Sequence, residues 1–185
     1  MKLSAILDDF GDHILAGCRR CGPAAGATRR HNGLARAIAD ISSAAGFEGR
    51  IHDGPIFNFH SGLRPADVWQ RNPLHAAGEA IDLTIGARSV HSVDVREEQK
   101  RAKYRTQLAS HPHLAFTPLA IDLSGEIGRA AADLLARWAK RLAATRVMDG
   151  LSPGDARGEL TAALARAFTR SITDQARAWA SPSLP

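Results

Sequence analysis

Two short stretches, Arg64-Pro65-Ala66-Asp67-Val68-Trp69 and Ala80-Ile81-Asp82-Leu83-Thr84-Ile85, decide the fold. Asn, Pro and Gly lie between them, and these turn-forming residues predict two neighbouring strands. Each strand carries one aspartate. Asp82 is flanked by apolar residues on both sides, and an unpaired charge in such a strand is costly unless it meets a cation. Adjacent strands therefore predict that Asp67 and Asp82 lie side by side.

The sheet extends in both directions from these two strands. Gly49 to Phe59, Ala66 to Gln70 and Glu79 to Ile85 are short segments bounded by Gly, Pro and Asn, which predicts an antiparallel meander. Leu114 to Leu123 has a strand pattern as well. We expect it to join the same sheet.

Apolar spacing near 3.6 residues predicts four helices around this sheet. The first runs from His31 to Ala45, residues 94–110 form the second, Ala130 to Thr145 form the third, and the last follows the break at 150–154. The predicted order is α-β-β-β-α-β followed by two helices, which is a mixed α/β domain with a helical C-terminal extension.

A length of 185 residues fits one hydrophobic core of ordinary size. Within it we distinguish an N-terminal arm (1–30), the α/β core (31–125) and the helical extension (126–185). The 44% hydrophobic and 23% charged residues are typical of a globular protein, and no apolar run is long enough to span a bilayer. The first ten residues lack the pattern of a secretory signal. We therefore expect an intracellular protein, nuclear in a eukaryote and cytoplasmic otherwise.

The formal net charge of +5 favours polyanionic partners, of which nucleic acid is the natural candidate. Only four of the 24 basic residues are lysine, and an Ala- and Gly-rich chain with many arginines is also typical of GC-rich coding. A basic surface without a partner is the alternative. The arginines expected to contact nucleic acid are Arg29, Arg30, Arg64, Arg101 and Arg105.

Two neighbouring carboxylates suit the hydrolysis of a phosphodiester. Mg²⁺ accepts one or two carboxylates and keeps waters for the substrate and the nucleophile. In the alternative reading, Asp67 forms a cap or turn and Asp82 makes an ordinary hydrogen bond near a sheet edge.

The motifs resemble those of the restriction-like endonuclease domain of site-specific non-LTR retrotransposons and related reverse-transcriptase-derived genes, a branch of the PD-(D/E)XK superfamily. They are His31-Asn32 at a helix start, then residues 64–68 and 81–85, then Lys100 and Lys103-Tyr104 in a later helix. The resemblance covers about residues 11–125. It implies a restriction-endonuclease-like core and a DNA-nicking enzyme dependent on Mg²⁺ or Mn²⁺.

The resemblance also implies roles for individual residues. Asp67 is then the first metal-binding acid and Asp82 the second. The family's usual lysine, two positions after the second acid, is Thr84 here, so Lys100 or Lys103 of the following helix takes its role, with Lys103 preferred. A lysine there stabilises charge on the scissile phosphate, although a basic residue on a helix is often only solvated.

Three other residues have open readings. Asp53 is either a third metal-binding acid or an Asp-Gly turn residue. His13 and Cys18 match the second half of the zinc knuckle that precedes the nuclease domain in the family. The first half is missing, so we expect no zinc, unless Cys21 and His31 complete a rearranged set of four ligands.

The leading interpretation is thus a metal-dependent DNA endonuclease. A catalytically inactive nucleic-acid-binding remnant is the main rival. The third interpretation is a structural module that self-associates through the C-terminal helices, using Trp138, Phe168 and Trp179. The oligomeric state does not follow from the sequence.

Overall fold

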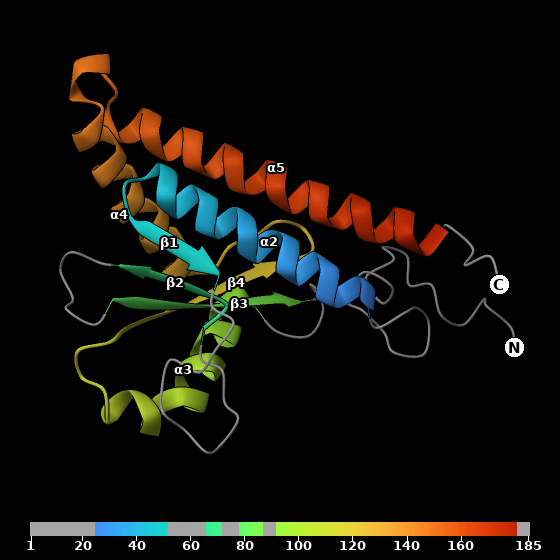
Figure 1. Ribbon diagram of the computed structural model, residues 1–185. Coiled ribbons are helices and arrows are strands. Elements are labelled where there is room, and N and C mark those ends of the chain that lie inside the picture. Colours follow the sequence, from blue (N-terminus) through green and yellow to red (C-terminus); the bar gives the residue numbers. More distant parts are fainter. Residues whose placement is uncertain (1–24, 52–65, 72–77, 87–91, 181–185) are drawn as a thin grey trace, which may run out of the picture.

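The computed structural model describes residues 25–51, 66–71, 78–86 and 92–180 (Figure 1). Its sheet has four strands in the order β1-β2-β3-β4, with β1–β2 and β2–β3 antiparallel and β3–β4 parallel. The strands are β1 (Glu48–Ile51), β2 (Val68–Arg71), β3 (Glu79–Gly86) and β4 (Ala115–Asp122).

Helices cover both faces of this sheet (Figure 1). On one face lie three helices that share a hydrophobic core with the strands, and on the other lies the crossover helix between β3 and β4. The first three are α2 (Ala25–Ala44), α4 (Arg129–Thr145) and α5 (Pro153–Ala180), and the crossover helix is α3 (Val93–Ala109). A short 3₁₀ turn, Val147–Asp149, joins α4 to α5.

The residues of the core follow from two patterns in the sequence, which are alternation along the strands and spacing of about 3.6 residues along the helices. In β3, Ile81 and Leu83 face α2, α4 and α5 in the core, so Asp82 between them faces the side that carries α3. In α2, Leu34 and Ile38 are fully buried at helical spacing. The sheet therefore presents one apolar face and one face with an acidic residue at its centre.

The predicted mixed α/β class and the order of its elements are confirmed for the described residues. The start of α2 differs from the prediction. Residues 25–30 were expected to belong to a loop or arm because they lack apolar spacing, yet they are helical, since Ala and Arg favour helix regardless of periodicity. The expected boundary between residues 30 and 31 falls inside this helix. Residues 52–59 of the expected first strand lie outside the described residues.

The start of α4 is fixed by a side chain from α3. The carboxylate of Glu97, which is buried, accepts hydrogen bonds from the backbone N–H groups of Ala130 (2.8 Å) and Ala131 (3.2 Å). A Cβ at Gly128 would lie 2.2 Å from this carboxylate, so the glycine leaves the room that the contact needs. Burial raises the pKa of Glu97 above its ordinary value. The contact ties the crossover helix to the C-terminal helices.

A polar network crosses the interior between the sheet and α4. The buried Glu79 accepts hydrogen bonds from Gln70 (2.7 Å), Thr117 and Arg137. The indole N–H of Trp138 in turn donates to Gln70 (3.0 Å). Buried polar groups need such partners, and here they fix α4 against three strands.

Two of the three side chains that were expected to mediate self-association are buried within the molecule. Trp138 is 1% exposed and Phe168 is 8% exposed, because both pack into the core between the sheet, α4 and α5. They are not available to a second molecule. The side chain of Trp179 lies outside the described residues. None of the described helices is both long and apolar enough to cross a bilayer.

Candidate active site

Asp67 directly precedes β2, and Asp82 lies in the adjacent strand β3. Val68 pairs with Ile81, and the backbone N–H of Asp67 donates a hydrogen bond to the carbonyl oxygen of Ile81 at 2.9 Å, so Asp67 lies beside the start of this strand pairing. The Asp67 side chain is held there, because its Oδ2 accepts a hydrogen bond from the backbone N–H of Leu83 at 2.7 Å. Asp67 and Asp82 are therefore close enough for the charge of Asp67 to raise the pKa of Asp82.

Asp82 is paired with a lysine from α3. The Nζ atom of Lys100 lies 2.6 Å from Oδ2 of Asp82, whose residue is only 3% exposed. Burial raises the pKa of Asp82 to about 6, an effect that neighbouring Asp67 strengthens and Lys100 opposes. Since the raised pKa remains despite the lysine, the negative charge at this position is incompletely balanced.

Asp67 is paired with a histidine from α2. The Nε2 atom of His31 lies 3.2 Å from Oδ2 of Asp67 and 3.4 Å from the carbonyl oxygen of Leu83. The hydrogen bond to Asp67 raises the pKa of His31 against the opposing effect of burial. Burial alone would raise the pKa of Asp67, but its hydrogen bonds with His31 and Leu83 hold it below its ordinary value. Asp67 is therefore ionised near neutral pH.

The side chains of His31 and Asp67 lie where β2, if it were longer, would pair with Leu83. The N–H and C=O of one strand residue point toward the same neighbouring strand. For Leu83 that neighbour would be β2, but β2 begins at Val68, and its pairing with β3 begins at Ile81. The side chains of Asp67 and His31 contact the two backbone groups instead.

Two lysines were candidates for the phosphate, and only Lys100 contacts an acid of the pair. Lys103 is exposed, and its Nζ lies 4.9 Å from the ring centroid of Tyr104. The geometry therefore favours Lys100, the opposite of the order preferred from the sequence. Tyr104 itself is 2% exposed and packs edge-on against Phe116 with ring centroids 5.4 Å apart, so it belongs to the interior.

Thr84 is a polar residue near Asp82 in β3. It follows Asp82 by two residues in β3, so both side chains are on the face that carries α3. Its hydroxyl oxygen is buried and has no hydrogen-bond partner among the residues that the structure describes. The Thr84 hydroxyl group can therefore form a hydrogen bond with a further partner.

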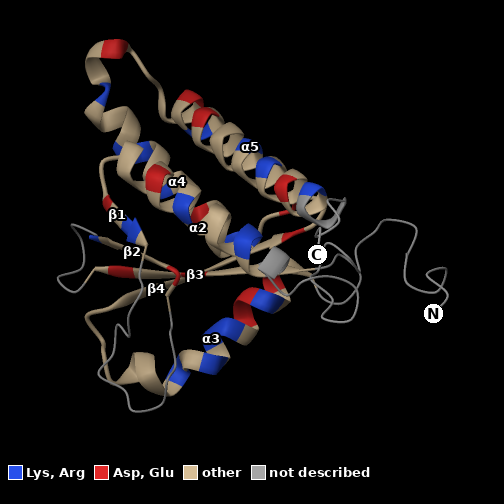
Figure 2. Cartoon of the chain, turned by 45° about the vertical axis from the view of Figure 1, so that its right-hand side comes forward, with Lys and Arg blue, Asp and Glu red and all other residues tan. Residues whose placement is uncertain are grey.

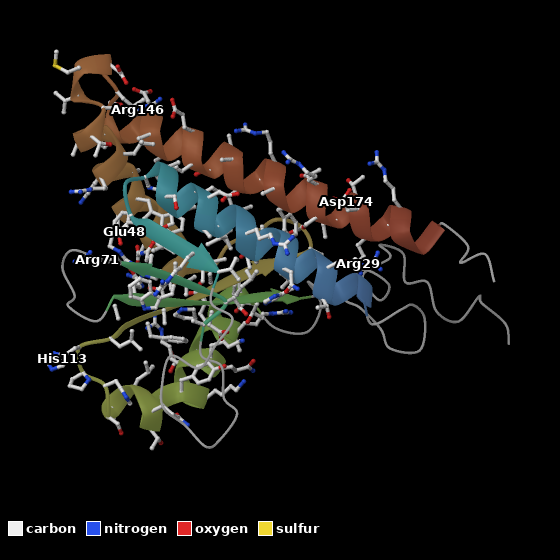
Figure 3. The ribbon with its side chains drawn as sticks, viewed as in Figure 1. Arg29, Glu48, Arg71, His113, Arg146 and Asp174 are labelled. Atoms are coloured by element: carbon white, nitrogen blue, oxygen red, sulfur yellow. The ribbon has the colours of Figure 1, made fainter. Side chains whose placement is uncertain are left out.

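The basic residues are divided between surface and interior. Lys and Arg follow one another along α3 (Figure 2), and Arg101 and Arg105 are exposed there. Arg29 is exposed near the start of α2 (Figure 3). Arg30 is 4% exposed, and burial lowers its pKa to about 10, so this arginine is not part of the exposed basic surface.

Some predicted residues lie outside the described part of the chain. They are His13, Cys18, Cys21, Asp53 and Arg64. Within the described ranges, no three His, Cys, Asp or Glu side chains are gathered closely enough to hold a metal ion. The acid pair and its immediate neighbours are therefore the candidate site.

No known protein-family model and no curated protein matches the chain. The position of His31 beside Asp67 was not predicted from the sequence. His31 could have been identified as a candidate site residue, because His31-Asn32 is one of the motifs on which the resemblance rests.

Proposed function

We propose that the chain is a divalent-metal-dependent endonuclease that nicks DNA, derived from the restriction-like endonuclease domain of a non-LTR retrotransposon. One observation carries the proposal. Asp82, buried in a strand beside Asp67, is in contact with a lysine from the following helix. Two acids can hold a metal ion and a lysine can stabilise charge on a phosphate, so this set suits hydrolysis of a phosphodiester.

The donor set fits a hard cation. Mg²⁺ is commonly held by one or two carboxylates together with waters and substrate phosphates, so two aspartates are sufficient. The pKa of Asp82 supports this fit, because burial raises it to about 6 even beside Lys100. A buried carboxylate with an incompletely balanced charge gains from a second positive neighbour.

Each group of the chain then has a distinct task. Asp67 and Asp82 hold the cation, which supplies positive charge for the transition state and a water of lowered pKa. Lys100 lies where its ammonium group reaches both Asp82 and a phosphate oxygen placed beside it, and it stabilises the charge that develops on that oxygen. The exposed arginines of α3, Arg101 and Arg105, bind neighbouring phosphates of the DNA backbone.

A second candidate function is supported by a different feature of the same site. Each aspartate already has a basic partner within the chain, Lys100 for Asp82 and His31 for Asp67. Such pairing partly balances the charges of the two acids without a metal and fits an inactive nucleic-acid-binding remnant that retained the basic surface of α3.

Nicking of a supercoiled plasmid separates the two functions. We expect the purified protein to convert supercoiled DNA to the open circular form with Mg²⁺ or Mn²⁺ and to leave it intact with a chelator. Asp82→Asn should abolish the activity, because an amide is a weaker ligand for a hard cation. Asp133→Asn, at an exposed position of α4, is the matched control. Salt-sensitive DNA binding without nicking at any metal concentration would select the remnant.

A further inference from the structure

One ring nitrogen faces two oxygen atoms at the candidate site. Nε2 of His31 lies 3.2 Å from the Oδ2 atom of Asp67 and 3.4 Å from the carbonyl oxygen of Leu83. The three atoms come from three different places in the chain: α2, the residue before β2, and β3. They meet where β3 has no backbone partner from β2.

These separations are those of neighbouring ligands around one cation. Metal–ligand bonds to His nitrogen and carboxylate oxygen are about 2.0–2.2 Å long. Adjacent ligands are then separated by about 3.0 Å in an octahedron and about 3.4 Å in a tetrahedron, from the geometry of those bond lengths. Both measured separations are close to this range. Both distances from Nε2 are therefore compatible with a cation in place of the shared proton.

We infer that His31 is a metal ligand of this site through Nε2, together with Asp67 and the carbonyl of Leu83, and that the site prefers Mn²⁺ or Co²⁺ to Mg²⁺. The inference rests on the proposed metal-dependent function and names the ligand set and the class of cation. Asp82 lies near this set, and its own carboxylate is paired with Lys100.

The preference for a transition metal follows from the chemistry of the donors. Carboxylate and carbonyl oxygens accept Mg²⁺ and Mn²⁺ alike, whereas imidazole binds first-row transition metals. Mg²⁺ also keeps several waters and is rarely held by an all-protein set. A nitrogen ligand thus adds affinity for Mn²⁺ or Co²⁺ and little for Mg²⁺.

The competing reading is a purely structural histidine. In that reading His31 donates its Nε2 proton to Asp67 and Leu83 and only completes the edge of β3. The two readings differ in whether a bound metal has nitrogen in its coordination sphere. They also differ in whether replacement of His31 changes the affinity for Mn²⁺ more than that for Mg²⁺.

Pulsed electron paramagnetic resonance on the Mn²⁺-loaded full chain tests the inference without an activity measurement. We expect modulation from a directly bound ¹⁴N nucleus in the parent protein and its loss in His31→Gln, whose amide can still donate a hydrogen bond. His113→Gln, which changes an exposed histidine in the turn between α3 and β4 (Figure 3), should retain the signal. Calorimetry should show Mn²⁺ affinity about tenfold or more weaker in His31→Gln, with Mg²⁺ affinity nearly unchanged.

A second measurement makes the test independent of any variant. If the parent protein is prepared with ¹⁵N-labelled histidine, the modulation must shift to the ¹⁵N frequency, whether or not His31→Gln folds. Mn²⁺ bound in an Asp82-dependent manner without a histidine nitrogen would overturn the inference and leave the proposed function standing. If the parent binds neither Mn²⁺ nor Mg²⁺, the proposed metal site fails, and the inference fails with it.

Discussion

The ammonium group of Lys100 lies 2.6 Å from a carboxylate oxygen of Asp82, and the pair bridges the crossover helix α3 and the central strand β3. If this lysine stabilises charge on the scissile phosphate, Lys100→Ala should lower the nicking rate by about a hundredfold or more, as the loss of a transition-state contact does. Single-turnover nicking of a supercoiled plasmid measures the change.

Lys103→Ala is the matched control on the same helix. Lys103 is exposed and contacts the ring of Tyr104 rather than an acid, so its replacement should change nicking by less than about threefold, with a modest loss of DNA affinity. A large loss for Lys103→Ala with parental activity in Lys100→Ala would reverse the assignment. Far-ultraviolet circular dichroism of both variants checks that α3 remains folded.

The metal-free protein should become more stable when Asp82 is replaced by Asn. The folded pKa of Asp82 is about 6 and its ordinary value is 3.8, so the folded state binds this proton more tightly than the unfolded state does. Its contribution to stability is therefore greatest below about pH 4 and is lost as the pH rises toward 6. Asp82→Asn removes this pH-dependent loss of stability, because the amide does not ionise. It should raise the free energy of unfolding near pH 7.5 by on the order of 1–3 kcal/mol.

Urea denaturation in the presence of a chelator tests this at two values of pH. The difference between Asp82→Asn and the parent should be large at pH 7.5 and small at pH 4, where the parent carboxyl is mostly protonated in the folded state. The exposed Asp133→Asn should show no such difference. An asparagine variant less stable than the parent at pH 7.5 would mean that the pair with Lys100 outweighs the cost of burial.

Local periodicity was sufficient to predict most of the fold. The spacing of Leu34 and Ile38 predicts one buried face of α2. The nearness of Asp67 and Asp82 follows from two short segments with turn residues between them. The helical residues 25–30 were not predictable in this way, because a helix turn without apolar side chains leaves no periodic signal.

The neighbours of the two acids depend on tertiary packing that sequence spacing does not specify. Lys100 and Lys103 are three residues apart in a helix, so their directions differ by only about 60°, and only the position of β3 under α3 selects Lys100. His31 contacts Leu83, which is 52 residues away, because of how α2 crosses the sheet. A contact over such a separation has no local signature.

Glu97 should contribute to stability through the start of α4. Replacement by Ala leaves the buried N–H groups of Ala130 and Ala131 without their carboxylate, and each unsatisfied donor of this kind is costly. We expect Glu97→Ala to lower the free energy of unfolding by about 1–3 kcal/mol. Glu98→Ala, at the exposed neighbouring position, should change it by less than about 0.5 kcal/mol in urea denaturation. Equal effects of the two variants would argue against the cap.

The exposed arginines of α3 should set the salt dependence of DNA binding. Arg101 and Arg105 are exposed on the same helix as Lys100, so we expect DNA bound at the acid pair to contact them. Each phosphate contact releases about one counterion, so Arg101→Ala with Arg105→Ala should reduce the slope of log affinity against log salt by about two. Fluorescence anisotropy with labelled duplex DNA at several salt concentrations measures this slope. Arg146→Ala, in the connection between α4 and α5, should leave it unchanged (Figure 3). An unchanged slope in the α3 double variant would remove α3 from the DNA-binding surface, whether or not the protein cleaves DNA.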